Sequence, residues 1–205
     1  AKILLASAIY VQGDVEKSLK LFDGNIKQAS LLNDNYSFAK GNLGKGWALW
    51  EESKYEKALE SYANALPIFE DLNKKGDIIR TLHAIGFVYT CLGLSEKAID
   101  IFIQAKTLAE EIQDDAKIDS SNNLLGIEYT FAKRYDEALT IFLNQLSSIN
   151  SRDYTKYRAW IHCNLGLTYF LINEYHKAAE YLKIAYDIYS KIGPNSDELW
   201  VLSWL

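Results

Sequence analysis

The sequence contains no methionine and only two prolines and two cysteines among its 205 residues. So few prolines leave long helices almost uninterrupted. Two cysteines exclude a framework of several disulfides, and free thiols favour a reducing compartment. Because position 1 is alanine rather than methionine, we expect a processed product or a segment of a longer protein.

Composition and charge are those of a folded globular chain. Apolar residues make up 49% and charged residues 24%, which excludes intrinsic disorder. The formal net charge is −5, whereas nucleic-acid-binding proteins present basic surfaces, so no nucleic-acid partner is expected. No apolar run approaches the roughly 20 residues needed to cross a bilayer, so no membrane partner is expected. We expect a cytoplasmic protein.

The apolar stretch at residues 3–11 (ILLASAIYV) has two interpretations. It could be the core of a signal peptide, with a cleavage site at Ala6, Ser7 and Ala8. However, only Lys2 precedes it as a positive charge, and the stretch is in phase with a helix that recurs along the chain. We therefore favour the helix.

A 40-residue repeat runs through the chain. Each unit carries a glycine, then an aromatic residue or leucine, an alanine and a large apolar residue at fixed distances. These residues are Gly46, Gly86, Gly126 and Gly166; Leu49, Tyr89, Tyr129 and Tyr169; Ala58, Ala98, Ala138 and Ala178; and Tyr62, Phe102, Phe142 and Leu182. One period earlier the pattern reaches Ala6, Ile9, Ser18 and Phe22, so a divergent first unit is expected.

Each unit is predicted to be a pair of helices. In the third unit, apolar residues recur at three- and four-residue steps on either side of Gly93, which is typical of two helices with one apolar stripe each. Ser95 is expected to cap the second helix. The first stripe is Ile78, Leu82, Ile85 and Tyr89, and the second is Ala98, Ile99, Phe102, Ala105, Leu108 and Ile112.

Stacking of these pairs would give an all-α solenoid. One helix pair cannot bury its faces alone, so neighbouring pairs must share a continuous core. Small residues allow the paired helices to approach closely, and the aromatic residue one turn later fills the space beside them. The predicted units are about residues 1–33, 34–75, 76–114, 115–152 and 153–193, with the start of a further helix at 196–205.

The repeat resembles the tetratricopeptide family. Leu125-Gly126-x-x-Tyr129 followed by Ala138-x-x-x-Phe142 is similar to the family pattern, and the other units repeat it in register over nearly the whole chain. The resemblance implies a right-handed α-solenoid. Because the period is 40 residues rather than about 34, each helix is expected to be about one turn longer.

The resemblance also implies a concave groove, lined by the first helix of each unit, that binds peptides or partner helices. Carried over position by position, it gives a face of aromatic, aliphatic and hydrogen-bonding residues. These candidate binding residues are Trp47, Trp50, Arg80, His83, Phe87, Asn123, Ile127, Trp160, Asn164 and Phe170. The expected partner is a protein or peptide with an apolar or amphipathic segment.

Two alternatives stay open for these residues. Trp47 and Phe87 could belong to the packed core, where aromatic residues at helical spacing are common. Arg80 could pair with a neighbouring acid rather than with a ligand. No unit carries the paired lysine, asparagine and arginine residues with which members of the family hold acidic chaperone tails, so such a ligand is not expected.

Signatures of catalysis and cofactor binding are missing. Residues 41–46 (GNLGKG) do not match a phosphate-binding loop, so they favour a softened or hinged helix. The three histidines, His83, His162 and His176, show no metal-ligand spacing. Cys91 and Cys163 are expected to be buried apolar residues. We therefore expect no enzyme activity, catalytic residue, metal or cofactor.

The last residues, 196–205, match the start of another first helix and end in WVLSWL. Their apolar edge is expected to meet a further unit, a second copy of the chain or a neighbouring domain. The sequence thus predicts a single array over residues 1–205 that acts as a non-catalytic scaffold. The expected role is sensing or regulation within a larger bacterial signalling or transcription regulator; the alternative is a structural adaptor for secretion, cargo or complex assembly.

Overall fold

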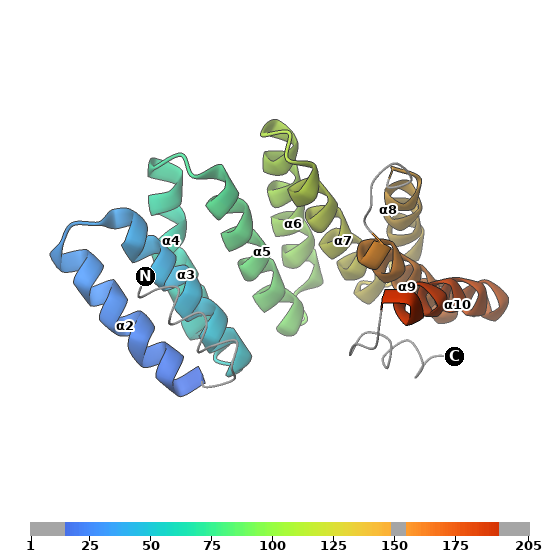
Figure 1. The fold of residues 1–205 in the computed structure, drawn as a ribbon, viewed down its shortest axis with the longest axis horizontal. Coiled ribbons are helices and arrows are strands. Elements are labelled where there is room, and N and C mark those ends of the chain that lie inside the picture. Colours follow the sequence, from blue (N-terminus) through green and yellow to red (C-terminus); the bar gives the residue numbers. More distant parts are fainter. Residues whose placement is uncertain (1–14, 149–154, 193–205) are drawn as a thin grey trace. The chain divides into compact units, whose positions relative to one another are not determined.

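The structure, a computed structural model, describes residues 15–148 and 155–192. Within these ranges the regular elements are nine α-helices, with no strand, and they are labelled in Figure 1. Their bounds are α2 Val15–Leu31, α3 Asn35–Glu51, α4 Tyr55–Asp71, α5 Lys75–Cys91, α6 Ser95–Glu111, α7 Asp115–Phe131, α8 Tyr135–Ser148, α9 Thr155–Leu171 and α10 Tyr175–Ile192. The prediction of an all-α fold is confirmed.

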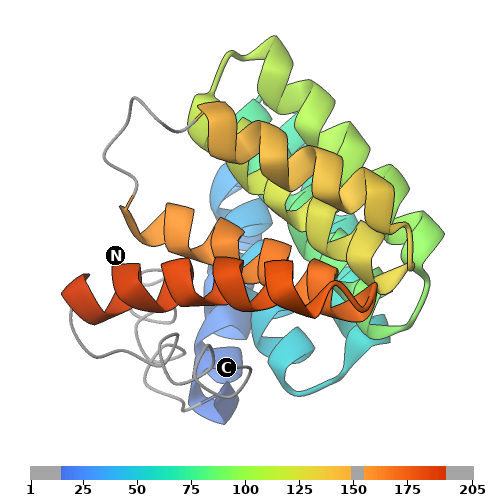
Figure 2. The same ribbon diagram turned by 90° about the vertical axis from the view of Figure 1, so that its right-hand side faces the viewer.

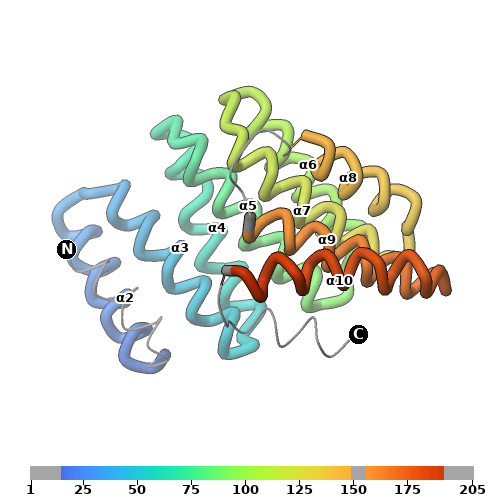
Figure 3. The backbone as a smooth tube through the Cα atoms, turned by 45° about the vertical axis from the view of Figure 1, so that its right-hand side comes forward, coloured from blue at the N-terminus to red at the C-terminus, as the bar shows by residue number. Residues whose placement is uncertain are grey.

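The chain divides into two compact units, unit 1 (Ala1–Ile118) and unit 2 (Asp119–Leu205), with the boundary inside α7. In unit 1, α2 packs against α3, α3 against α4, α4 against α5, and α5 against α6 (Figures 1 and 3). In unit 2, α8 packs against α9 and α9 against α10 (Figure 2). Stacked helix pairs of this kind are those of the predicted solenoid.

Some sequence predictions lie beyond these observations. The interpretations of residues 1–14, including the signal peptide, and the further helix at 196–205 lie outside the described residues. The single array over the whole chain and its unit boundaries stay predictions.

Equal helix lengths explain the 40-residue period. Six consecutive helices, α2 to α7, have 17 residues each, and three residues separate each from the next. Two helices and two turns therefore make one repeat. We call α3, α5, α7 and α9 the first helices of their pairs, and α2, α4, α6, α8 and α10 the second helices.

The seven turns that the structure describes, from α2 to α8 and from α9 to α10, share one backbone conformation. Each places one residue at a positive φ between 50° and 69° just after the helix; these residues are Asn33, Ser53, Asn73, Gly93, Gln113, Lys133 and Asn173. After α3, the Ser53 N–H donates to the Trp50 carbonyl at 2.9 Å and the Lys54 N–H to the Leu49 carbonyl at 2.9 Å. This is the Schellman pattern, which satisfies the last carbonyls of the helix.

The predicted role of Ser95 is wrong. Helix α6 begins at Ser95, and the capping position is Leu94, which makes no side-chain capping bond. The Schellman turn after α5 fixes the chain entering α6, so this helix starts where the turn ends.

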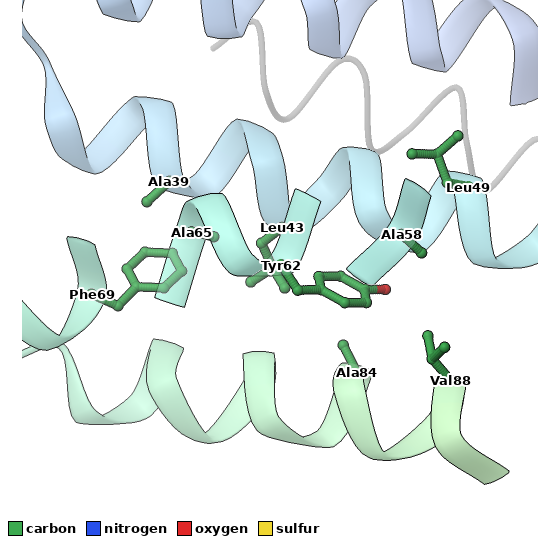
Figure 4. Packing of buried hydrophobic residues seen from close by; sticks show 9 residues of the cluster. All are labelled: Ala39, Leu43, Leu49, Ala58, Tyr62, Ala65, Phe69, Ala84 and Val88. Atoms are coloured by element: carbon green, nitrogen blue, oxygen red, sulfur yellow. The ribbon is translucent and has the colours of Figure 1, made fainter. Parts of the chain in front are cut away.

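In three pairs a glycine of the first helix contacts a ring of the second, and in the pair of α9 and α10 Gly166 contacts Leu182 instead. A Cβ added to Gly46 would overlap Tyr62, one added to Gly86 would overlap Phe102, and one added to Gly126 would lie 2.6 Å from Phe142 Cε1. In unit 1 the buried core around this contact includes Ala39 and Leu43 of α3, Ala65 and Phe69 of α4, and Ala84 and Val88 of α5 (Figure 4).

The glycine-rich segment of α3 is not a break in the helix. Residues 41–46 lie within the continuous helix Asn35–Glu51. A Cβ at Gly41 would lie 2.8 Å from Ile26 Cγ1, and one at Gly44 would overlap the Phe22 ring. These glycines let α2 approach α3, so close packing explains them without the expected softening or hinge.

Adding one methyl group at the glycine–ring contact should destabilise the fold. Gly86→Ala forces the new Cβ against Phe102, and we expect overpacking to lower the free energy of unfolding by about 1–3 kcal/mol. Urea unfolding followed by circular dichroism measures this change.

Gly24→Ala provides the matched control. Gly24 also lies within a helix, α2, but nothing is within 4 Å of its added Cβ. This variant should gain up to about 1 kcal/mol from helix propensity. Equal stability of the two variants would contradict the assigned role of the Gly86 contact.

Candidate functional site

An aromatic cluster lies on two neighbouring first helices of unit 1. The rings of Trp47 and Trp50 on α3 meet edge to face at 5.7 Å, and Phe87 on α5 lies 5.7 Å from Trp47 and 6.1 Å from Trp50. All three are half-buried. Ring pairs at such distances contribute about 0.5–1.5 kcal/mol each beyond area burial, so the cluster is a rigid apolar surface. We call these residues the unit 1 aromatic face.

Trp47 and Phe87 lie partly in the core and partly at the surface. Trp47 reaches inward to Tyr62 at 6.4 Å, and Phe87 reaches Phe102 at 6.1 Å. Each nevertheless retains exposed surface. The rings therefore extend the core outward to the surface of α3 and α5.

A buried carboxylate joins the other ends of the same two helices. Asp77 on α5 accepts a hydrogen bond from the Tyr36 hydroxyl at 3.1 Å and ion pairs from Lys40 at 3.3 Å and Arg80 at 2.8 Å. The Asp77 side chain is 7% exposed, whereas that of Arg80 is 59% exposed. Burial, followed by the hydrogen bond to Asp77, raises the pKa of Tyr36.

Arg80 thus pairs with a neighbouring acid, the alternative that the sequence left open. It lies seven residues before Phe87, so about 10 Å of helix separates the two. The surface of α3 and α5 is therefore amphipathic, with rings at one end and a partly neutralised cation pair at the other.

His83 lies between these two ends on α5. Its ring meets Phe102 at 6.4 Å in an edge-to-face arrangement. Burial lowers the pKa of His83 to about 4, so its imidazole is neutral near pH 7. Its position adds a polar but uncharged group beside the aromatic face.

In unit 2, polar side chains connect α7 to α9. The Asn164 amide donates to Asn123 Oδ1 at 2.9 Å, and the hydroxyls of Thr130 and Thr168 lie 3.1 Å apart. All four residues are buried, with Asn123 only 2% exposed. The two candidate asparagines therefore bind each other across the helices, and neither presents an open amide to solvent.

The remaining candidates of unit 2 are apolar. Trp160 is 49% exposed and Phe170 is 40% exposed on α9, where Phe170 meets Tyr175 at 5.6 Å. Ile127 on α7 is half-buried against the cluster of Ala138 and Phe142. We call Trp160 and Phe170 the unit 2 aromatic residues.

The sequence analysis missed Asp77 and the contact between the two threonines. Asp77 lies three residues before Arg80, a spacing at which helical side chains meet, so the pair could have been found. The partners of Asp77 on α3, Tyr36 and Lys40, could not be found without knowing which residues of α3 and α5 face each other. Thr130 and Thr168 lie 38 residues apart, off the repeat spacing, and nothing in the sequence links them.

The described residues hold no group of three or more histidine, cysteine, aspartate or glutamate side chains that could bind a metal ion. Among the same residues, no helix is long and apolar enough to span a bilayer. Cys91 is exposed and Cys163 is buried, so the expectation that both thiols are buried is wrong for Cys91, which lies at the exposed end of α5.

A tetratricopeptide repeat profile matches residues 42–111 and 117–191, which together make up more than half of the chain. The chain belongs to the tetratricopeptide repeat family. No curated protein sequence gives a significant match to it.

Solved structures share the tetratricopeptide fold at low sequence identity. BtubC (BKLC) from P. vanneervenii superposes with a TM-score of 0.80 at 19% identity, covering 93% of this chain and 80% of that one. The apo form of the quorum sensor NprR from B. thuringiensis gives a TM-score of 0.72 at 16% identity, covering 99% of this chain and 56% of that one. YrrB, described as having an unusual peptide-binding site, gives a TM-score of 0.57 at 21% identity, covering 100% of this chain and 91% of that one. At these identities the likeness concerns the fold alone.

Acid should destabilise the chain through His83 and His162. Burial, and for His162 also the positive charge of Arg158, lowers the pKa of each from 6.5 to about 4. The unfolded chain therefore binds more protons than the folded chain between these values. The stability due to the neutral rings is present above pH 6.5 and is lost as pH falls toward 4, by at most about 1.4 kcal/mol per histidine and pH unit. Urea unfolding at pH 7 and pH 5 measures the loss.

The double variant His83→Leu/His162→Asn should lose less stability between these pH values. Leucine and asparagine occupy the same repeat positions at Leu43 and Asn122, so both should fit. His176→Asn removes an exposed histidine and should behave like the wild type. If the double variant and the wild type lose equal stability, the two buried histidines are not the cause.

Proposed function

We propose that this chain is a non-catalytic tetratricopeptide scaffold that binds an apolar or amphipathic peptide or helix on its first helices. The observation that supports this most is the unit 1 aromatic face, where Trp47, Trp50 and Phe87 from two helices form one half-exposed apolar surface. Aromatic side chains that are already held in place provide contact area at little further entropic cost, which suits them to binding.

The polarity of this surface favours an amphipathic ligand. Apolar ligand side chains would pack on the aromatic face, and polar groups would lie near His83 and Arg80. In unit 2, Trp160, Phe170 and Ile127 would offer a separate apolar surface. Asn123 and Asn164 would act there by fixing α9 against α7, since their amides are engaged with each other.

We further propose that the scaffold is the sensing or regulatory segment of a larger cytoplasmic bacterial regulator. The shared fold with the quorum sensor NprR is compatible with this role. An effector domain, such as a kinase, cyclase or DNA-binding domain, encoded next to this segment would support it. A gene product without any effector domain would instead favour an adaptor.

Selection of displayed random-sequence peptides on the wild-type chain tests the binding function. Selected peptides should be rich in apolar residues, and fluorescence anisotropy gives the Kd of each labelled peptide. Phe87→Ala should raise the Kd of peptides that bind unit 1, and Trp160→Ala that of peptides that bind unit 2, each by about 30-fold, the effect of losing a contact worth about 2 kcal/mol.

Leu31→Ala is the control, because Leu31 is 75% exposed on the second helix α2 and lies outside both aromatic surfaces. Its Kd should equal that of the wild type. If no peptide is selected, or if selected peptides bind all variants equally, the first helices are not the binding surface.

A further inference from the structure

Two rows of side chains run along the first helices of unit 1. On α5, Arg80, His83 and Phe87 follow one another at steps of three and four residues, and on α3 Lys40 and Trp47 stand seven residues apart. Residues at these steps share one face of a helix. Each of the two helices therefore carries a cation and, about two turns further along, a ring of the unit 1 aromatic face.

The cations of the two rows share one carboxylate. Asp77 Oδ1 accepts from Lys40 Nζ at 3.3 Å and from Arg80 Nη2 at 2.8 Å. The other oxygen, Oδ2, accepts from the Tyr36 hydroxyl at 3.1 Å. A further cation, Lys74, lies 5.7 Å from the centre of the Tyr36 ring. The cluster therefore keeps an excess of positive charge, in a chain whose formal net charge is −5.

Arg80 carries the accessible part of this charge. Its side chain is 59% exposed, whereas that of Lys40 is 25% exposed. Arg80 Nη2 is bound to Asp77, and Nε donates to the Gly76 carbonyl at 3.4 Å. A guanidinium has more N–H donors than these two contacts use. Because the contact with Asp77 already holds the guanidinium in place, binding a second acceptor costs little further entropy.

A carboxylate is the ligand group that suits this cluster. It matches the excess charge, and it accepts charge-assisted hydrogen bonds from a guanidinium. About 10 Å of helix separates Arg80 from Phe87. A peptide that packs an apolar side chain on the aromatic face therefore reaches Arg80 with a side chain about three residues away if it is extended, and about seven residues away if it is helical.

We propose that the first helices of unit 1 select peptides that carry an aspartate or glutamate side chain at this distance from an apolar residue, and that Arg80 binds the acid. The inference rests on the binding function proposed above and adds the charge of the ligand to it. The ligand has a single acid among apolar residues, which differs from the acidic chaperone tails that the sequence makes unexpected.

A double-mutant cycle between the chain and a peptide tests this contact. The probes are displayed random-sequence peptides selected on the wild-type chain whose Kd rises in Phe87→Ala. They are synthesised with an amidated C-terminus, so that only a side chain can provide the negative charge. Most should contain an aspartate or glutamate at one of the two spacings.

The acid and Arg80 should act as one contact. Replacing the acid by asparagine or glutamine should raise Kd about fivefold, the effect of losing an exposed ion pair. Arg80→Gln should raise Kd by the same factor, and the two changes together should raise it no further. Asp77 keeps Lys40 and Tyr36 as partners in this variant, so the fold should be retained, which circular dichroism checks.

Lys57→Gln is the matched control, since Lys57 is an exposed cation on the second helix α4. It removes the same charge and should leave Kd unchanged. Peptides that depend on Phe87 but contain no acid, or losses that multiply in the cycle, would overturn acid recognition and leave the proposed binding function intact. Binding only by peptides with a free C-terminal carboxylate would overturn it as well. If no selected peptide depends on Phe87, both proposals fail for unit 1.

Discussion

The close approach of a glycine on one helix to a ring on its partner is the contact on which the rest of the structure depends. A hydrogen atom in place of a side chain at Gly86 leaves room for the Phe102 ring, and Gly46 does the same for Tyr62. The ring then fills the interior between helices, where alanines allow the next pair to approach. Because protein interiors are close-packed, this contact fixes the spacing of the pairs that have it, and Leu182 beside Gly166 takes the place of the ring in the pair of α9 and α10.

Uniform helices and uniform turns convert that local contact into a repeat. Because these helices have 17 residues each, equivalent apolar residues of successive pairs lie at the same level along the helix axis. Turns with one left-handed residue return the chain in the same direction each time. Of the seven described turn residues at positive φ, one is glycine and three are asparagine, which adopt this conformation readily. At Ser53, Gln113 and Lys133 the helices packed on either side must enforce it.

Polar contacts distinguish otherwise similar repeats. In unit 1, Asp77 gathers Tyr36, Lys40 and Arg80 at one end of α3 and α5, and this leaves the aromatic face at the other end as the apolar surface. In unit 2, buried amides and hydroxyls connect α7 to α9. These groups satisfy one another, so what the first helices offer to a partner is mainly their aromatic side chains together with the outer part of Arg80.

The sequence by itself determined the helices, their pairing and the core, because spacing along one chain records which residues share a helical face. Gly126, Ala138 and Phe142 were assigned to the hairpin core in this way, and the structure places them there. The sequence also nominated the aromatic face through the positions of Trp47, Trp50 and Phe87. Only the tertiary structure decided which polar candidate residues remain available to a ligand. The repeat spacing does not record which side chains of separate helices face each other. The side-chain distances in the structure do, and they show that Arg80 pairs with Asp77 and that Asn123 meets Asn164.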